Sequence, residues 1–391
     1  MNRLIDIRFG ILLLLTLLVV GCGDKDTPAF MPSNSVFVMY IQLPESEAIT
    51  RGEGDSKDIF ADKAYESSVK TIDVWVFPSG STSQIDLGDG TKKDYLYEHM
   101  GQTSLSQRLT TVSFKVADSF ISNNEGLKLD IYVVINAASV GLSWDDNGTT
   151  TKSALEALSF SGSYFDINTL TSIDDFIVEK GLPMSGYLKN ADIITEEGQY
   201  TTEHVMIKRA VSKLRFVLAK APGMDNAKIH SISLSGGKIP VSEYVFSGTL
   251  AENGADLHND WTGTDYVTNG YEWSGMSSVA IPEHQDPASL KWSSADYTPQ
   301  SWEDAINDAI ADKTALEYTR AYLRESPLKL TGSISYEVVN GETKTANFSM
   351  ANEGDFLRNH SWTVYIYLYQ NGLVFEVAKW DTESHSFKPF I

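Results

Sequence analysis

Cysteine is almost absent from this sequence, because the 391 residues contain only Cys22. A single cysteine cannot form an intramolecular disulfide or supply a zinc site with two thiolates. The seven histidines are scattered, and the chain contains no H-E-x-x-H pair, P-loop, G-x-S-x-G elbow or dinucleotide fingerprint. A glycosidase could still hide its two carboxylates among the 52 acidic residues. These absences favour a non-catalytic protein, and we expect no enzyme activity, no cofactor and no metal site.

Positive charge is also scarce. The sequence has 31 Lys and Arg against 52 Asp and Glu, which gives a formal net charge of −21. A surface this acidic repels nucleic acid and anionic lipid, so charge attraction to either is excluded. The apolar fraction of 42% is ordinary and is sufficient to form a buried core.

Long hydrophobic runs are absent except for one near the N-terminus, Phe9–Val20. It is shorter than the roughly 20 residues of a membrane span, and Arg3 and Arg8 precede it. Gly21-Cys22 follows, in the arrangement that lipoprotein signal peptidase recognises. We therefore expect a signal peptide over residues 1–21 and a lipid on Cys22, which would be the first mature residue. The alternative is an ordinary secretory signal with an incidental cysteine.

Strand-like segments dominate the rest of the chain and predict β-strands. Val36–Leu43 is a β-rich run, whereas Thr71–Phe77, Leu127–Ala137 and Lys213–Leu218 alternate with period two. The full set of segments is Val36–Leu43, Thr71–Phe77, Leu127–Ala137, Lys213–Leu218, Ile334–Val339, Thr343–Met350, Trp362–Tyr369 and Leu373–Trp380. Asn340-Gly341 and Asn371-Gly372 each separate two such segments, which is a hairpin signal. The expected fold is all-β, with antiparallel β-sandwiches and a few short helices. The expected core residues are Ile72, Val74, Val76, Leu129, Ile131, Val133, Leu214, Phe216, Val364, Ile366 and Leu368.

Helices are expected after the capping residues Ser153, Ser172 and Ser301. The acidic segments 88–90 and 145–148 suggest calcium loops, but they lack the ligand spacing of an EF-hand, and turns are the favoured interpretation. Alternate tyrosines between residues 365 and 369 could form a sugar-stacking platform. The favoured interpretation of that row is a strand with one face in the core and the other half-covered by a neighbouring strand or partner.

Several segments in order resemble the fimbrillin family of the Bacteroidales, the subunits of type V pili. They are the lipoprotein signal ending at Cys22, the strand Val36–Leu43 followed by Thr50-Arg51, Ile72–Phe77, Tyr132–Ala137, Leu182–Gly186, Ile207–Leu214, Phe356–Trp362 and Trp380. The resemblance implies two tandem transthyretin-like β-sandwich domains without catalytic residues. The expected parts are a signal peptide (1–21), a propeptide with the first strand (22–51), an N-terminal sandwich (52–203) and a C-terminal sandwich (204–391).

The resemblance also implies cleavage by an arginine-specific protease between Arg51 and Gly52, followed by assembly through donor-strand exchange. The donor and acceptor strand residues would be Val36, Val38, Tyr40, Phe375 and Val377. The expected partners are other pilin subunits, the outer membrane through the lipid on Cys22, and host or bacterial surface ligands. The expected location is the cell surface, in a fimbrium or as an outer-membrane lipid anchor. The alternatives are an anchor subunit that keeps its lipid and a surface glycan-binding lipoprotein.

Overall fold

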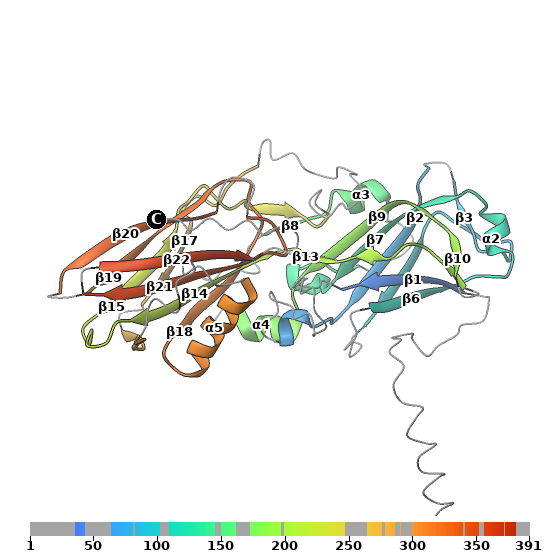
Figure 1. Ribbon diagram of the computed structural model, residues 1–391. Helices are drawn as coiled ribbons and strands as arrows, with labels where there is room; N and C mark the ends of the chain where they lie inside the picture. Colours follow the sequence, from blue (N-terminus) through green and yellow to red (C-terminus); the bar gives the residue numbers. More distant parts are fainter. Residues whose placement is uncertain are drawn as a thin grey trace, which may run out of the picture.

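The computed structural model describes residues 36–43, 64–80, 83–101, 109–144, 150–161, 173–196, 199–246, 264–275, 278–285, 290, 299–338, 341–351, 356–370 and 372–380. Strands dominate these residues, and the α-helices among them are short. The strands form two sandwiches that lie end to end (Figure 1). The predicted all-β class with two sandwiches is confirmed.

The N-terminal sandwich contains two sheets of five strands each. The first has the order β10-β11-β1-β12, with β6 also paired to β1, and the second has the order β13-β9-β7-β2-β5. The bounds in the first sheet are β1 Val36–Gln42, β6 Leu109–Lys115, β10 Ile194–Glu196, β11 Gln199–Thr201 and β12 Val205–Met206. Those in the second are β2 Ile72–Pro78, β5 Leu96–Met100, β7 Lys128–Ile135, β9 Met184–Asp192 and β13 Lys208–Arg209.

The C-terminal sandwich contains two sheets of four strands, in the orders β18-β14-β21-β22 and β17-β15-β19-β20. The bounds in the first are β14 Ser212–Lys220, β18 Leu316–Leu323, β21 Ser361–Tyr369 and β22 Gly372–Trp380. Those in the second are β15 Lys228–Leu234, β17 Tyr271–Ser274, β19 Leu330–Glu337 and β20 Thr343–Ala351. Most pairings are antiparallel, but β14 and β21 run parallel along their full contact. The two predicted hairpins are confirmed as β19–β20 and β21–β22.

The cores follow the predicted alternation. Every core residue predicted from the sequence is at most 1% exposed. The N-terminal set belongs to the cluster between the first two sheets, and the C-terminal set belongs to the cluster between the other two. Period-two alternation therefore identified the inward faces of the long strands correctly.

The residues around the predicted domain boundary extend the N-terminal sheets. The stretch 190–204 was expected to separate the two domains, yet β10 and β11 lie within it and pair with each other. The strands β12 and β13 then pair with β1 and β9. Residues 205–209 therefore belong with the N-terminal sheets, while the division into domains at 203/204 stays a prediction.

The helices are α2 Phe120–Asn123, α3 Lys152–Glu156, α4 Ile173–Lys180 and α5 Pro299–Ala311, with 3-10 turns η1 Ala64–Ser67 and η2 Ala137–Val140. The predicted cap of α3 was wrong, because the side chain of Thr151, not Ser153, accepts a hydrogen bond from the backbone N–H of Ala154. The helix α5 begins before the predicted Ser301. Gly181 ends α4 at a φ of 74°, a conformation that favours glycine.

Two small sheets complete the fold. The strands β3 (Ile85–Asp86) and β4 (Lys92–Lys93) flank a turn in which the carboxylates of Asp86 and Asp89 accept backbone N–H groups. This confirms a turn at residues 88–90, while residues 145–148 lie outside the described residues. The strand β8 (Ser159–Ser161) pairs with β16 (Ser242–Tyr244), which connects the two halves of the chain. Just beyond β16, Phe246 is fully buried in the N-terminal core.

Ile131 tests the packing of the N-terminal core, where its side chain is fully buried. We expect Ile131→Ala to lower the free energy of unfolding by about 2–5 kcal/mol, because truncation leaves a cavity. Val178→Ala is the control, since that side chain is 50% exposed, and its effect should stay within about 0.5 kcal/mol. Urea denaturation followed by tryptophan fluorescence measures both. Equal losses for the two variants would contradict this core.

Candidate functional site: strand β1 and its groove

The strand β1 lies inside its sheet with neighbours on both sides. It pairs antiparallel with β6 along its whole length, from Val36↔Lys115 to Gln42↔Leu109. On the other side it pairs in parallel with β11 and then with β12. Figure 1 shows β1 and β6 side by side in the N-terminal sandwich. The strand β1 is therefore an internal strand of its sheet and not an edge strand. The strands β11 and β12 were missed because segments of two or three residues show no periodicity.

Three side chains of β1 fill the core. Phe37, Met39 and Ile41 are fully buried and belong to the N-terminal core cluster. The ring of Phe37 lies 5.4 Å from that of Phe120 and 6.1 Å from that of Phe114, measured between centroids. Burial of side chains of this size contributes about 1.5–3 kcal/mol each. The strand is therefore an integral part of the N-terminal sandwich.

The residues proposed from the sequence for this strand have the opposite phase. Val36 and Tyr40 are partly exposed, and Val38 is 4% exposed but lies outside the core cluster. The ring of Tyr40 lies 5.2 Å from that of His204. Sequence reasoning missed Phe37, Met39 and Ile41 because the run is apolar at nearly every position, so alternation could not identify the inward face. The exchange role assigned to Val36, Val38 and Tyr40 stays a prediction.

Only some of the other predicted site residues lie within the described residues. Cys22, Arg51 and Gly52 lie outside the described residues. The backbones of Phe375 and Val377 belong to β22, where they pair with Ile366 and Val364. The strand β22 is the end strand of its sheet and, among the described strands, pairs only with β21.

The tyrosine row does not form an open platform. Tyr365 and Tyr367 are 1% and 6% exposed and pack with Trp302 and Ile306 of α5 in one cluster. Burial is the main cause that raises the pKa of Tyr365 above its ordinary value. The second face of this strand is covered, as expected, but the cover is the helix α5 rather than a neighbouring strand or partner, and it is nearly complete at Tyr365 and Tyr367. A sugar-stacking surface on these two tyrosines is not supported.

A buried charge cluster holds β16 in place. The guanidinium of Arg358 donates to the carboxylate of Glu243, and its Nε lies 3.2 Å from Oε1 of Glu325. It also donates to the backbone oxygens of Tyr244, at 2.7 Å, and Val245, at 2.9 Å. The three charged side chains are at most 4% exposed. One cation therefore serves two carboxylates at the point where β16 enters the N-terminal half.

No group of His, Cys, Asp and Glu that could hold a metal ion occurs within the ranges that the structure describes. Within the same ranges, none of the helices has the length and apolar character required to cross a membrane.

No family model matches the chain, and no curated protein matches it by sequence. Solved structures do match, with low identity. One is a proposed cell-adhesion protein from Parabacteroides distasonis, with 11% identity, a TM-score of 0.48, and coverage of 90% of this chain and 99% of that chain. Another is the tip fimbrial protein Mfa3 from Porphyromonas gingivalis, with 11% identity, a TM-score of 0.46, and coverage of 89% and 99%. A fimbrial assembly protein from Parabacteroides distasonis has 11% identity, a TM-score of 0.42, and coverage of 91% and 98%.

The Glu243 cluster makes stability depend on pH. Burial is the main cause that raises the pKa of Glu243 well above its ordinary value of 4.5; the nearby Glu325 adds to the rise, and Arg358 opposes it. A carboxyl whose folded pKa is raised contributes stability that is present below its unfolded pKa and is lost as the pH rises through its folded pKa.

We therefore expect Glu243→Gln, which mimics the protonated form, to lose less stability than the natural protein as the pH rises from about 4.5. Urea denaturation at successive pH values measures this difference. Glu98→Gln, at an exposed position of β5, serves as the control. Parallel pH profiles for the Glu243 variant and the natural protein would contradict the assignment.

Proposed function

We propose that this protein is a structural subunit of a cell-surface fimbrium, and that strand exchange at β1 joins it to its neighbours. The observation that carries the proposal is the position of β1. It fills one side of the N-terminal core through Phe37, Met39 and Ile41, yet it is the first described strand and precedes η1 by a segment that includes Arg51.

Removal of β1 would leave a groove with strong affinity for another strand. The backbone of β6 would lose its full ladder, and the short strands β11 and β12 would lose their pairings with β1. The pockets of Phe37, Met39 and Ile41 would become open apolar surface. A strand from another subunit with large apolar residues at alternate positions satisfies both needs at once.

Processing would convert a tethered precursor into the assembling form. Export as a lipoprotein would place the chain at the outer membrane through the lipid on Cys22. Cleavage between Arg51 and Gly52 would then release lipid and β1 together, because both precede the cut. The C-terminal strand, with Phe375 and Val377, is the proposed donor to the next subunit. If Arg51 is not cut, the same chain keeps its lipid and serves as an anchor subunit.

Arg51→Ala tests the processing step. The natural chain, treated with an arginine-specific protease, should yield a product that begins at Gly52 and then ladders that resist SDS, because strand pairing along a whole β-strand dissociates slowly. The variant should yield neither. N-terminal sequencing of the surface form distinguishes Gly52 from acylated Cys22. A mature form that begins at Cys22 would identify an anchor subunit instead.

A peptide of residues 36–42 tests the groove itself. Added in excess to the cleaved protein, it should reoccupy the groove and prevent the ladders. A matched peptide with Phe37, Met39 and Ile41 replaced by Ser should have no effect, because it keeps the backbone but lacks the core side chains. Equal activity of the two peptides, or no activity of either, would contradict exchange at β1.

A further inference from the structure

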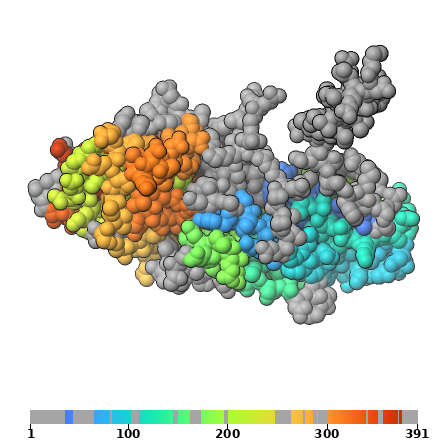
Figure 2. Space-filling model, turned by 90° about the horizontal axis from the view of Figure 1, so that it is seen from below, coloured from blue at the N-terminus to red at the C-terminus, as the bar shows by residue number. Residues whose placement is uncertain are grey.

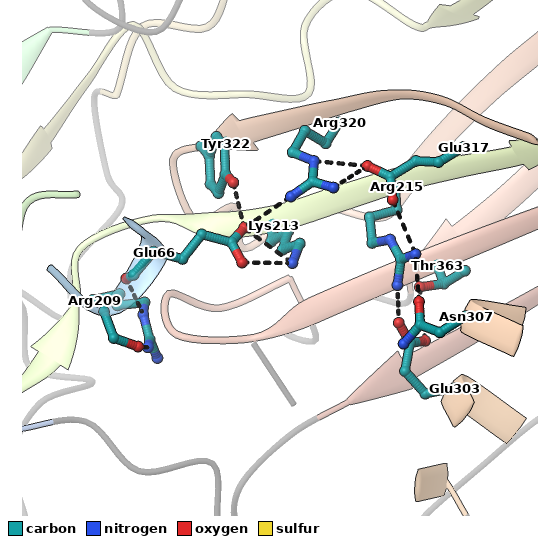
Figure 3. A network of polar contacts seen from close by, with 11 residues as sticks. Glu66, Arg209, Lys213, Arg215, Glu303, Asn307, Glu317, Arg320, Tyr322 and Thr363 are labelled. Atoms are coloured by element: carbon teal, nitrogen blue, oxygen red, sulfur yellow. Dashed lines mark hydrogen bonds and ion pairs between the residues drawn. The ribbon is translucent and has the colours of Figure 1, made fainter. Parts of the chain in front are cut away.

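Glu66 is a carboxylate that is sealed from water where the two sandwiches meet. Its side chain is 0% exposed, and Nζ of Lys213 lies 2.9 Å from Oε1 and 3.0 Å from Oε2. The hydroxyl of Tyr322 donates to Oε1, and Nη1 of Arg320 lies 3.5 Å from the same oxygen (Figure 3). Each oxygen of the Glu66 carboxylate therefore has at least one hydrogen-bond or ion-pair partner.

These donors come from the opposite half of the chain. Glu66 lies on η1, shortly before β2, whereas Lys213 belongs to β14, and Arg320 and Tyr322 belong to β18. Figure 2 shows the segment that carries η1, in blue, against the green of α4 and between the orange and cyan parts of the molecule. The contact therefore joins the N-terminal sandwich to the outer face of a C-terminal sheet.

Arg209 reinforces the contact from the backbone side. Its Nε donates to the backbone oxygen of Glu66, and its Nη2 donates to Oγ of Ser67, each at 3.3 Å. Its Nη1 donates to Oδ1 of Asn359, also at 3.3 Å. Asn359 lies just before the strand β21. The turn η1 is thus held through the side chains of Glu66 and Ser67 and through the backbone oxygen of Glu66.

The charges around Glu66 alternate along one sheet face. Arg320 connects Glu66 to Glu317, whose other oxygen lies 3.0 Å from Nη2 of Arg215, and Arg215 pairs with Glu303 of α5 (Figure 3). In the described ion pairs, Lys213, Arg320 and Arg215 are matched by Glu66, Glu317 and Glu303. Buried charges are tolerated only when they are matched in this way.

We propose that Glu66 is an interdomain clamp, which couples the two sandwiches into one cooperative unit and anchors the chain at η1. None of these contacts involves a residue of β1, so they would stay in place if β1 were removed. That last consequence rests on the proposed function, but the clamp itself does not.

The clamp is tested by hydrogen exchange and calorimetry on the full chain. The natural protein should unfold in one calorimetric transition, because the clamp makes the two sandwiches unfold together. Glu66→Gln leaves Lys213 and Arg320 buried without the Glu66 charge and should split this transition into two. Exchange at the amides of residues 66–70 and 212–213 should rise by roughly tenfold or more, while exchange within β7 and β19 should not change.

Tyr322→Phe is the milder variant, in case Glu66→Gln fails to fold. It removes one donor to Glu66 and should raise exchange at the same amides by a smaller factor. Tyr318→Phe is its matched control, because Tyr318 is on the same strand and its hydroxyl contacts the backbone oxygen of Ser274 instead. Exchange that rises equally in both sandwiches, or a single transition with unchanged local exchange in both test variants, would overturn the clamp.

Discussion

The buried carboxylate of Glu66 imposes a constraint that reaches through much of the chain. An unmatched charge in such a site costs several kcal/mol, so cations must surround it. Lys213 and Arg320 meet this need, and Arg320 and Arg215 require Glu317 and Glu303 in turn. In the first half of β14, Lys213 and Arg215 therefore alternate with Leu214 and Phe216 of the C-terminal core. The ion pair between Glu303 and Arg215 also ties α5 to this sheet, in addition to the packing of Trp302 and Ile306 against it.

The strand β1 and the turn η1 are held in the N-terminal half by different interactions. The strand β1 is held by core packing and by strand pairing, both of which another strand of suitable pattern can reproduce. The turn η1 is held by specific ion pairs and hydrogen bonds, which a generic strand cannot replace. If the proposed exchange removed β1, the contacts that hold η1 would still join the two sandwiches. Proposed exchange and proposed clamp are therefore compatible within one molecule.

Sequence reasoning succeeded where a strand is long and covered on one face by core. Ile131 in β7 and Phe216 in β14 are examples, since alternation alone identified their inward side. It failed at β11 and β12, where pairing depends on partners distant in sequence rather than on local pattern. It also gave no sign that Lys213 and Arg215 are buried, because charged residues at alternate positions ordinarily indicate a solvent face. Their partners become visible only when distant segments are brought together.

The pairing directions around β1 also limit how the proposed strand exchange could proceed. A replacement strand must run antiparallel to β6 and parallel to β11 and β12, so its direction is fixed in the groove. A reversed strand would meet the backbone groups of β6 in a parallel pattern and lose the native register. Each proposed joint would then connect the C-terminal strand of one subunit to the N-terminal sandwich of the next. Such contacts are heterologous and do not pair off as a symmetric dimer, so repetition of the joint produces a polar filament wherever the rotation between subunits does not close a ring.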